Sequence, residues 1–327
     1  MEQTDATGFS SAEPDDVTEA CTGAAPGGRP IGAALVPHVG GAASCRHCGS
    51  TSGTCACGTA AGPGSNGYGA MTPSYIYALG RIDPRFPRLA VEKELAQATG
   101  RAETAGLTDR QALHRVLSQP QNRYLIRQLC WVLTIEGLET YILQPRDSVD
   151  FAQLIEALRP TASPLDVDVV IGVRGPIAPP ELCNGLMVPI VAFDQLYAFD
   201  REALVKAIPR PEKIAAKQFE TAAGELLERI LQIADNAGAT DEHRALNYCA
   251  VRYSAIYATA ADAHGRDCAL TAVEVRHSRL SGVRKVVDVV FAYTHRQTDV
   301  TDKYFCRVDV TEEFPFLVTK LSPYYDR

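Results

Sequence analysis

The C-terminal third of the chain changes its hydrophobic period once, and this change constrains the fold more than any other feature. Residues 218–237 and 246–260 place apolar side chains at intervals of three and four, which predicts two amphipathic helices packed as an αα-hairpin. Apolar and polar side chains then alternate over residues 270–275, 286–293 and 303–310, which predicts β-strands. Strands grouped after helices favour an α+β fold with an antiparallel meander over a doubly wound sheet.

The preceding part of the chain predicts a second small unit of helices and mixed strands. Thr108 and Gln111 have the spacing of a capping box, in which each side chain bonds the other's backbone N–H at a helix start. Glu136-Gly137 separates two β-type runs, residues 129–133 and 140–143, and predicts a hairpin. The further expected elements are strands over residues 75–80, 167–173 and 188–193 and a helix over residues 147–158.

Residues 1–70 differ from the remainder in composition. They are rich in Gly, Ala, Ser, Thr and Pro and have almost no large apolar side chains, so burial cannot offset the entropy of ordering them. The sequence therefore predicts three parts: a disordered tail over residues 1–70, a first unit over 71–213 and a second unit over 214–327. Ile208-Pro209-Arg210-Pro211 reads as the linker between the two units.

Charge and hydropathy exclude several classes of protein. The formal charge of −7 disfavours a nucleic-acid partner. No stretch reaches the roughly 20 apolar residues that span a bilayer, and the first residues lack the pattern of a signal peptide. We therefore expect a cytoplasmic protein without a membrane partner. Its ten cysteines are then expected to be metal ligands or buried thiols, because structural disulfides are rare in reducing compartments.

Four cysteines of the tail lie within thirteen residues. Cys45, Cys48, Cys55 and Cys57 could surround one structural Zn²⁺, because thiolates are preferred zinc ligands and Cys45-x-x-Cys48 has the usual spacing. Two alternatives stay open. The thiols could be free in an unliganded tail, or residues 44–57 could be a substrate of heterocyclising enzymes, since they have the Cys, Ser, Thr and Gly composition of such peptides.

Other cysteines are weaker candidates for chemistry. Cys183 follows two prolines in a loop and could act as a nucleophile if His243 or His277 lay near it. The alternative is a loop cysteine packed under the next strand. The remaining group, Cys130, Cys249 and Cys306, is expected to consist of buried thiols.

Three polar groups admit a functional and a structural interpretation. Asp241, Glu242 and His243 look like an acid–base cluster, but they open a helix whose N-terminal dipole favours carboxylates. Arg174 is a candidate contact for a peptide carboxylate, or else an ordinary surface ion pair. Asp166 and Asp168 alternate with valines and are expected on the solvated face of a strand.

Much of the chain after residue 71 resembles the C-terminal region of PatG-type cyanobactin maturation proteases. The blocks that carry the resemblance are residues 81–87, 91–94, 99–108, 127–131, 172–181, 183–190, 236–248, 310–316 and 321–325. In that family, a domain of unknown function and a C-terminal domain follow a subtilisin-like protease that makes cyclic ribosomal peptides. The sequence contains neither the serine context of such a protease nor a Walker or dinucleotide motif.

The resemblance implies a pathway and no catalytic residue. We expect an accessory, non-catalytic protein that recognises a ribosomal precursor peptide or docks its tailoring enzymes, with edge strands of the C-terminal meander as one place for an extended peptide. Two alternatives stay open: an enzyme that modifies or releases the peptide through Cys183 or a metal, and a structural module that forms homodimers.

Overall fold

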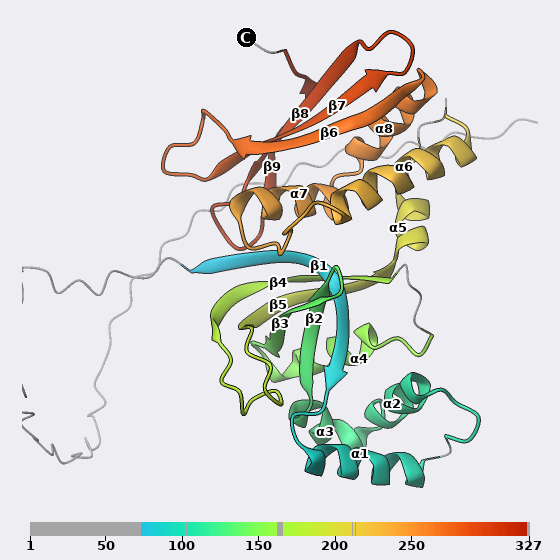
Figure 1. The fold of residues 1–327 in the computed structure, drawn as a ribbon, viewed down its shortest axis with the longest axis vertical. Helices are drawn as coiled ribbons and strands as arrows, with labels where there is room; N and C mark the ends of the chain where they lie inside the picture. The colour runs from blue at the N-terminus through green and yellow to red at the C-terminus, as the bar shows by residue number, and fades with distance from the viewer. Residues whose placement is uncertain (1–72, 103, 162–165, 211, 213, 326–327) are drawn as a thin grey trace, which may run out of the picture. The chain divides into compact units, whose positions relative to one another are not determined.

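The structure is a computed structural model that describes residues 73–102, 104–161, 166–210, 212 and 214–325. Its first part is a five-stranded closed barrel, with the strands in the order β1-β2-β3-β5-β4 (Figure 1). The strands are β1 (Ser74–Arg85), β2 (Cys130–Ile135), β3 (Leu138–Pro145), β4 (Asp166–Ile177) and β5 (Pro189–Asp200). β3 and β5 are parallel, and the other neighbouring pairs are antiparallel. This order and these directions are those of an OB-type barrel.

Long β1 closes the barrel because it has two partners in succession. Residues 74–80 pair with β4, and residues 81–85 pair with β2. The expected strand over residues 75–80 is therefore too short, since the strand continues through Gly80 into a second pairing. The predicted hairpin is confirmed: β2 and β3 are joined by Glu136 (φ 50°) and Gly137 (φ 81°), the two positive φ angles that a tight hairpin turn of this hand requires.

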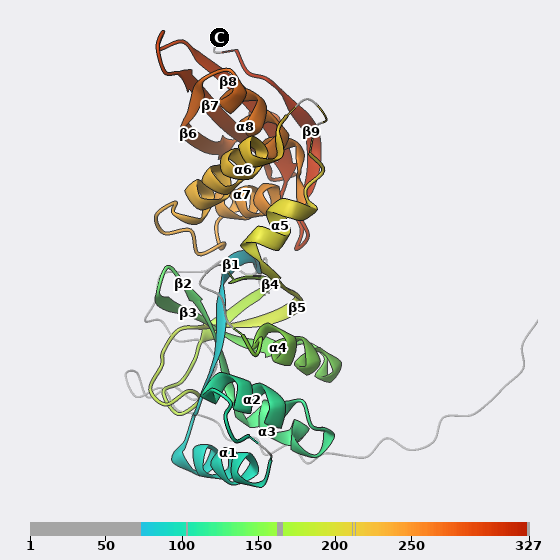
Figure 2. The same ribbon diagram turned by 90° about the vertical axis from the view of Figure 1, so that its right-hand side faces the viewer.

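Helices fill the connections of the barrel. Three of them, α1 (Leu89–Arg101), α2 (Asp109–Leu117) and α3 (Arg123–Gln128), lie between β1 and β2 and gather at one end of the barrel (Figure 2). The capping box at the start of α2 is confirmed, with Gln111 N–H donating to Thr108 Oγ1 and Thr108 N–H donating to Gln111 Oε1. α4 (Phe151–Ala157) connects β3 to β4, and α5 (Arg201–Ala207) follows β5.

The C-terminal part packs helices on one antiparallel sheet, so the α+β class is confirmed. Its helices are α6 (Ala216–Leu231), α7 (Asp241–Arg252) and α8 (Ala255–Gly265). Its strands are β6 (Cys268–His277), β7 (Val286–His295), β8 (Thr301–Asp309) and β9 (Phe316–Pro323), in this order across the sheet. The expected second helix is broken at Tyr253 (φ −116°, ψ 86°), and α6 packs chiefly against α8. β9 adds a fourth strand that the alternation did not predict.

Barrel and C-terminal helices share a hydrophobic core, because β1 is buried on both faces. Ile76 and Ala78 point into the barrel, whereas Tyr77 and Leu79 join the core beneath the C-terminal helices. Buried Asn247 of α7 donates to the carbonyl of Tyr77 at 2.7 Å. Gly238 approaches the same carbonyl so closely that a Cβ atom there would lie 2.3 Å from the oxygen. Gly238 and Asn247 therefore both serve this junction.

The expectation for Asp166 and Asp168 is wrong. Asp168 is only 2% exposed, and the side chain of Asp166 is 8% exposed and pairs with Arg159 at 2.7 Å. β4 is covered on both faces, since Val169 packs under the C-terminal helices while Val170 packs inside the barrel. Among the described residues, no helix is both long and apolar enough to cross a membrane.

Candidate functional site

A cavity of about 470 Å³ opens on the β2–β3 side of the barrel. Its walls come from the segment after β1, the end of α3, the starts of β2 and α4, the second half of β3 and the β4–β5 loop. The lining residues are Pro87, Arg88, Arg127, Gln128, Leu129, Cys130, Trp131, Ile142, Leu143, Gln144, Pro145, Phe151, Glu181 and Leu182. We call this cavity the barrel groove.

The barrel groove has an apolar floor and a charged rim. Trp131 and Leu143 of the floor belong to the barrel core and are each at most 2% exposed, whereas the neighbouring Ile142 packs against the disulfide on the other face of the strand. Trp131 is held in place by its indole N–H, which donates to the carbonyl of Ile126 at 3.0 Å. On the rim, the guanidinium of Arg127 lies 5.5 Å from the ring centroid of Phe151. This arrangement can accept an apolar side chain and orient a charged neighbour.

The charges of the rim have no partner of opposite sign among the residues that the structure describes. Arg88, Arg127 and Glu181 are exposed, and within the described ranges none of them forms an ion pair. Their charges are therefore available to a ligand. Both signs are present, so the rim favours a ligand of mixed charge over a polyanion.

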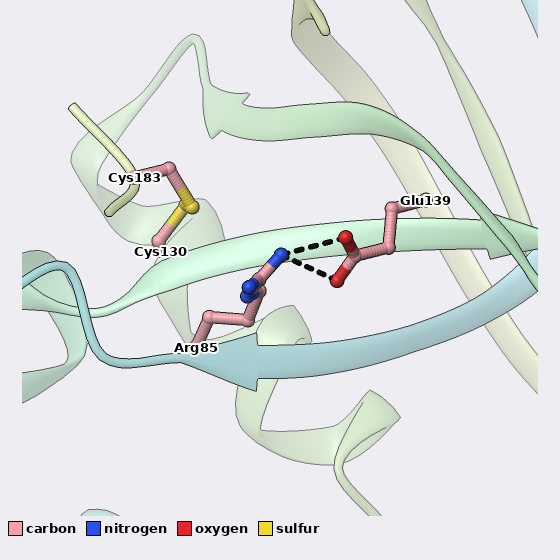
Figure 3. The surroundings of a disulfide bond; sticks show 4 residues. All are labelled: Arg85, Cys130, Glu139 and Cys183. Atoms are coloured by element: carbon pink, nitrogen blue, oxygen red, sulfur yellow. Dashed lines mark hydrogen bonds and ion pairs between the residues drawn. A yellow bond between two sulfur atoms is a disulfide. The ribbon is translucent and has the colours of Figure 1, made fainter. Parts of the chain in front are cut away.

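A disulfide between Cys130 and Cys183 fixes one wall of the barrel groove (Figure 3). It joins the start of β2 to the β4–β5 loop, and the Cα atoms are 5.8 Å apart, which is a usual separation for a disulfide. The loop is also closed by Gly185 N–H, which donates to the carbonyl of Pro180 at 2.7 Å. The expectation of reduced cysteines is therefore wrong for this pair. The two cysteines are 53 residues apart in the sequence, and only the folded barrel brings them together.

The disulfide also bears on the hypothesis that Cys183 is a nucleophile. The residue is fully buried and its sulfur is bonded, so it is not a free thiol in this structure. Neither His243 of α7 nor His277 of β6 lines the barrel groove. The packed loop cysteine, which was the structural alternative, agrees with this geometry.

An ion pair stands beside the disulfide and ties the end of β1 to the start of β3. Arg85 Nη1 lies 2.6 Å from both carboxylate oxygens of Glu139 (Figure 3). The two side chains are 36% and 41% exposed, so the pair contributes about 0–1 kcal/mol to stability. Neither of the two residues lines the barrel groove.

Other predicted residues lie elsewhere. Arg174 is exposed near the end of β4 and does not line the barrel groove, so its contact with a peptide stays a prediction. Asp241 and Glu242 stand in the first turn of α7, where Thr240 caps the helix by accepting from His243 N–H at 3.1 Å. Cys249 and Cys306 are buried free thiols, as expected, with their sulfurs 3.7 Å apart.

The cysteines of the predicted zinc site, Cys45, Cys48, Cys55 and Cys57, lie outside the described residues, as do residues 44–57 as a whole. Zinc binding there stays a prediction. In the part of the chain that is described, no group of three or more His, Cys, Asp or Glu side chains could hold a metal ion.

Sequence reasoning missed the groove residues because no local pattern marks them. Arg127 and Trp131 fall in one block of the family resemblance. Phe151 begins a helix that the sequence predicted without assigning it a functional residue. The order of the strands in the folded barrel brings Arg127, Trp131 and Phe151 together at the groove. The available signal was the resemblance block at residues 127–131, which joins an exposed arginine to a buried tryptophan.

Comparison with known proteins supports the resemblance. Residues 213–324 match the family described as PatG C-terminal. A solved structure titled "PatG Domain of Unknown Function" is 22% identical to this chain, with a TM-score of 0.62, and the match covers 77% of this chain and 98% of that one. No curated protein matches. The expected relation to PatG-type C-terminal regions is thus confirmed, and the structural likeness shows a shared fold.

Proposed function

From the similarity of residues 213–324 to the PatG C-terminal family, we propose that this chain is an accessory protein of ribosomal peptide maturation and binds an extended segment of a precursor peptide in the barrel groove. The observation that carries this proposal is the groove itself. It combines an apolar floor with charges of both signs that have no ion-pair partner among the described residues, as recognition of a peptide requires.

The position of the groove on the barrel supports a binding role. OB-type barrels bind extended polymers on the face of strands 2 and 3, between the connections that follow strands 1 and 4. The barrel groove lies in this position, and α1, α2 and α3 enlarge the first of those connections. A chain of formal charge −7 disfavours nucleic acid, so a peptide is the better polymer.

The chemistry of the lining favours binding over catalysis. Among its described residues there is no Ser, Thr, His or Lys side chain, and both cysteines at the edge of the groove are in the disulfide. Glu181 is the sole carboxylate of the lining, whereas general acid–base catalysis commonly pairs two titratable groups. Binding without turnover is therefore the function we assign to the groove.

The proposal is tested by fluorescence polarisation with labelled synthetic peptides that tile a cyanobactin-type precursor. We expect one or more peptides to bind the full-length protein. Mass spectrometry of the bound peptide should show that its mass is unchanged. Arg127→Glu should weaken binding about 10-fold, because charge-assisted contacts contribute roughly 1.5–3 kcal/mol. Arg229→Glu makes the same charge change on the exposed face of α6 and should leave the affinity unchanged.

Three results would contradict the proposal. Repeated covalent turnover of a peptide would make the protein an enzyme, and loss of that turnover in Cys183→Ala would assign it to the thiol. Self-association without affinity for any peptide would indicate a dimerisation module. Equal weakening by Arg127→Glu and Arg229→Glu would place the binding site outside the groove.

A further inference from the structure

A second cavity, of about 600 Å³, lies on the face of the C-terminal sheet that is turned away from its helices. The alternation of side chains along the strands identifies this face. Val289 of β7 and Cys306 of β8 point toward the helices and belong to the core under them. Their neighbours Asp288 and Arg307 therefore project from the opposite face, where both line the cavity. We call it the sheet cavity.

Arginines and aromatic rings alternate in the sheet cavity. The guanidinium of Arg276 lies 5.0 Å from the ring centroid of Tyr324 and donates to its hydroxyl. The guanidinium of Arg307 lies 4.8 Å from the ring of Phe305, and the two rings meet edge to face at 5.6 Å. Stacking holds both planar cations in place and leaves donors at their edges.

The charges form a row across three strands. Arg276 of β6 is opposite Asp288 of β7, and Asp288 is opposite Arg307 of β8. Arg307 Nε donates to buried Asp288 at 2.8 Å, so the inner end of the row is paired. At the outer end, Arg276 has no carboxylate partner within ion-pair distance among the described residues, and neither does exposed Arg279 beyond it. A negative charge beside β6 would continue the alternation.

The outer edge of β6 is open to another strand. In the described part of the chain, β6 pairs with β7 alone and ends at the sheet cavity with Arg276 and His277. The opposite edge is less available, because Leu321 N–H of β9 already donates to the hydroxyl of Tyr253 at 2.8 Å. An extended chain that pairs with β6 would place a side chain directly across from Arg276.

We propose that the sheet cavity binds a carboxylate of an acidic peptide segment that lies along the edge of β6, with Arg276 and Arg279 as its contacts. A carboxylate fits better than a phosphate. The acceptor is planar and matches the fork of a guanidinium, and buried Asp288 repels a dianion more strongly than a single charge. This site is separate from the barrel groove and does not depend on it.

The test uses the full-length protein and a fluorescein-labelled nonapeptide of alternating threonine and valine, capped at both ends, with glutamate at its centre. We expect it to bind about 10-fold more tightly than the same peptide with glutamine, since a charge-assisted pair is lost. The double variant Arg276→Gln, Arg279→Gln should remove this preference. The single variant Arg279→Gln alters an exposed side chain that has no ion-pair partner in the described ranges, and it should reduce the preference without affecting the fold.

Arg296→Gln is the control for loss of an arginine charge, because Arg296 is 52% exposed in the turn after β7 and lies outside the sheet cavity. It should retain the preference, as should Arg127→Glu, so that failure here is distinct from failure of the groove. Equal affinity for glutamate and glutamine peptides would overturn the proposal. So would a preference that survives the double variant, or tighter binding of a phosphoserine peptide, which would indicate a phosphate site.

Discussion

Replacement of Asp168 by asparagine should stabilise the protein at alkaline pH. The carboxyl group is 2% exposed within the wall of the barrel and accepts from Ile82 N–H at 2.7 Å. Burial raises its pKa to about 7, although the hydrogen bond from Ile82 and the charge of Arg159 act in the opposite direction. The usual value for an aspartate is 3.8, which we take for the unfolded chain.

The sign follows from proton affinity. The folded state holds the proton of Asp168 more tightly than the unfolded state, so stability is greatest below pH 4 and falls as the pH rises to about 7. A difference of about three pH units at 1.36 kcal/mol each gives roughly 4 kcal/mol. Asparagine keeps an acceptor for Ile82 N–H and never ionises. Asp168→Asn should therefore gain about 4 kcal/mol at pH 8.5 and nothing at pH 4.

Urea unfolding of both proteins between pH 4 and pH 8.5 measures this difference. Glu313, whose pKa burial also raises to about 7, is present in both proteins and cancels. Glu225→Gln on the exposed face of α6 controls for the loss of one negative charge. A variant less stable than the parent at pH 8.5, or a difference that does not change with pH, would refute the reasoning.

Two further predictions concern the covalent and polar links of the fold. The double variant Cys130→Ser, Cys183→Ser should lower the free energy of unfolding by about 4 kcal/mol, because the disulfide closes a loop of 53 residues. Urea unfolding of the parent protein with and without reductant should show the same loss. Asn247→Ala should cost about 2–3 kcal/mol, since the carbonyl of Tyr77 and the side chain of Asn236 lose a buried partner. Thermal unfolding measures this cost, and an unchanged Tm would contradict it.

Local features of this protein could be predicted because each depends on a few neighbouring residues. Thr108 and Gln111 form their capping box within one helical turn. Glu136-Gly137 adopts positive φ angles that few other pairs tolerate, and the turn then sets the hairpin. The meander follows from alternation within each strand. These interactions are already available to a short peptide, so the sequence alone determines them.

The candidate sites could not be predicted, because they depend on which strands become neighbours. β1 changes partner in the middle of the strand, and this closes the barrel and buries Asp168 on a strand that alternation alone marks as half-solvated. Closure also brings Cys130 to Cys183 and Arg127 to Phe151.

The sheet cavity has the same origin. Arg276, Asp288 and Arg307 are far apart in the chain and adjacent only through the register of β6, β7 and β8. The sequence by itself therefore determined the capping box, the hairpin turn, three strands of the C-terminal sheet and the relation to PatG-type regions. The tertiary structure decided the barrel, the disulfide and both cavities, because pairing between distant strands depends on burial summed over the whole fold and leaves no signature in any single segment.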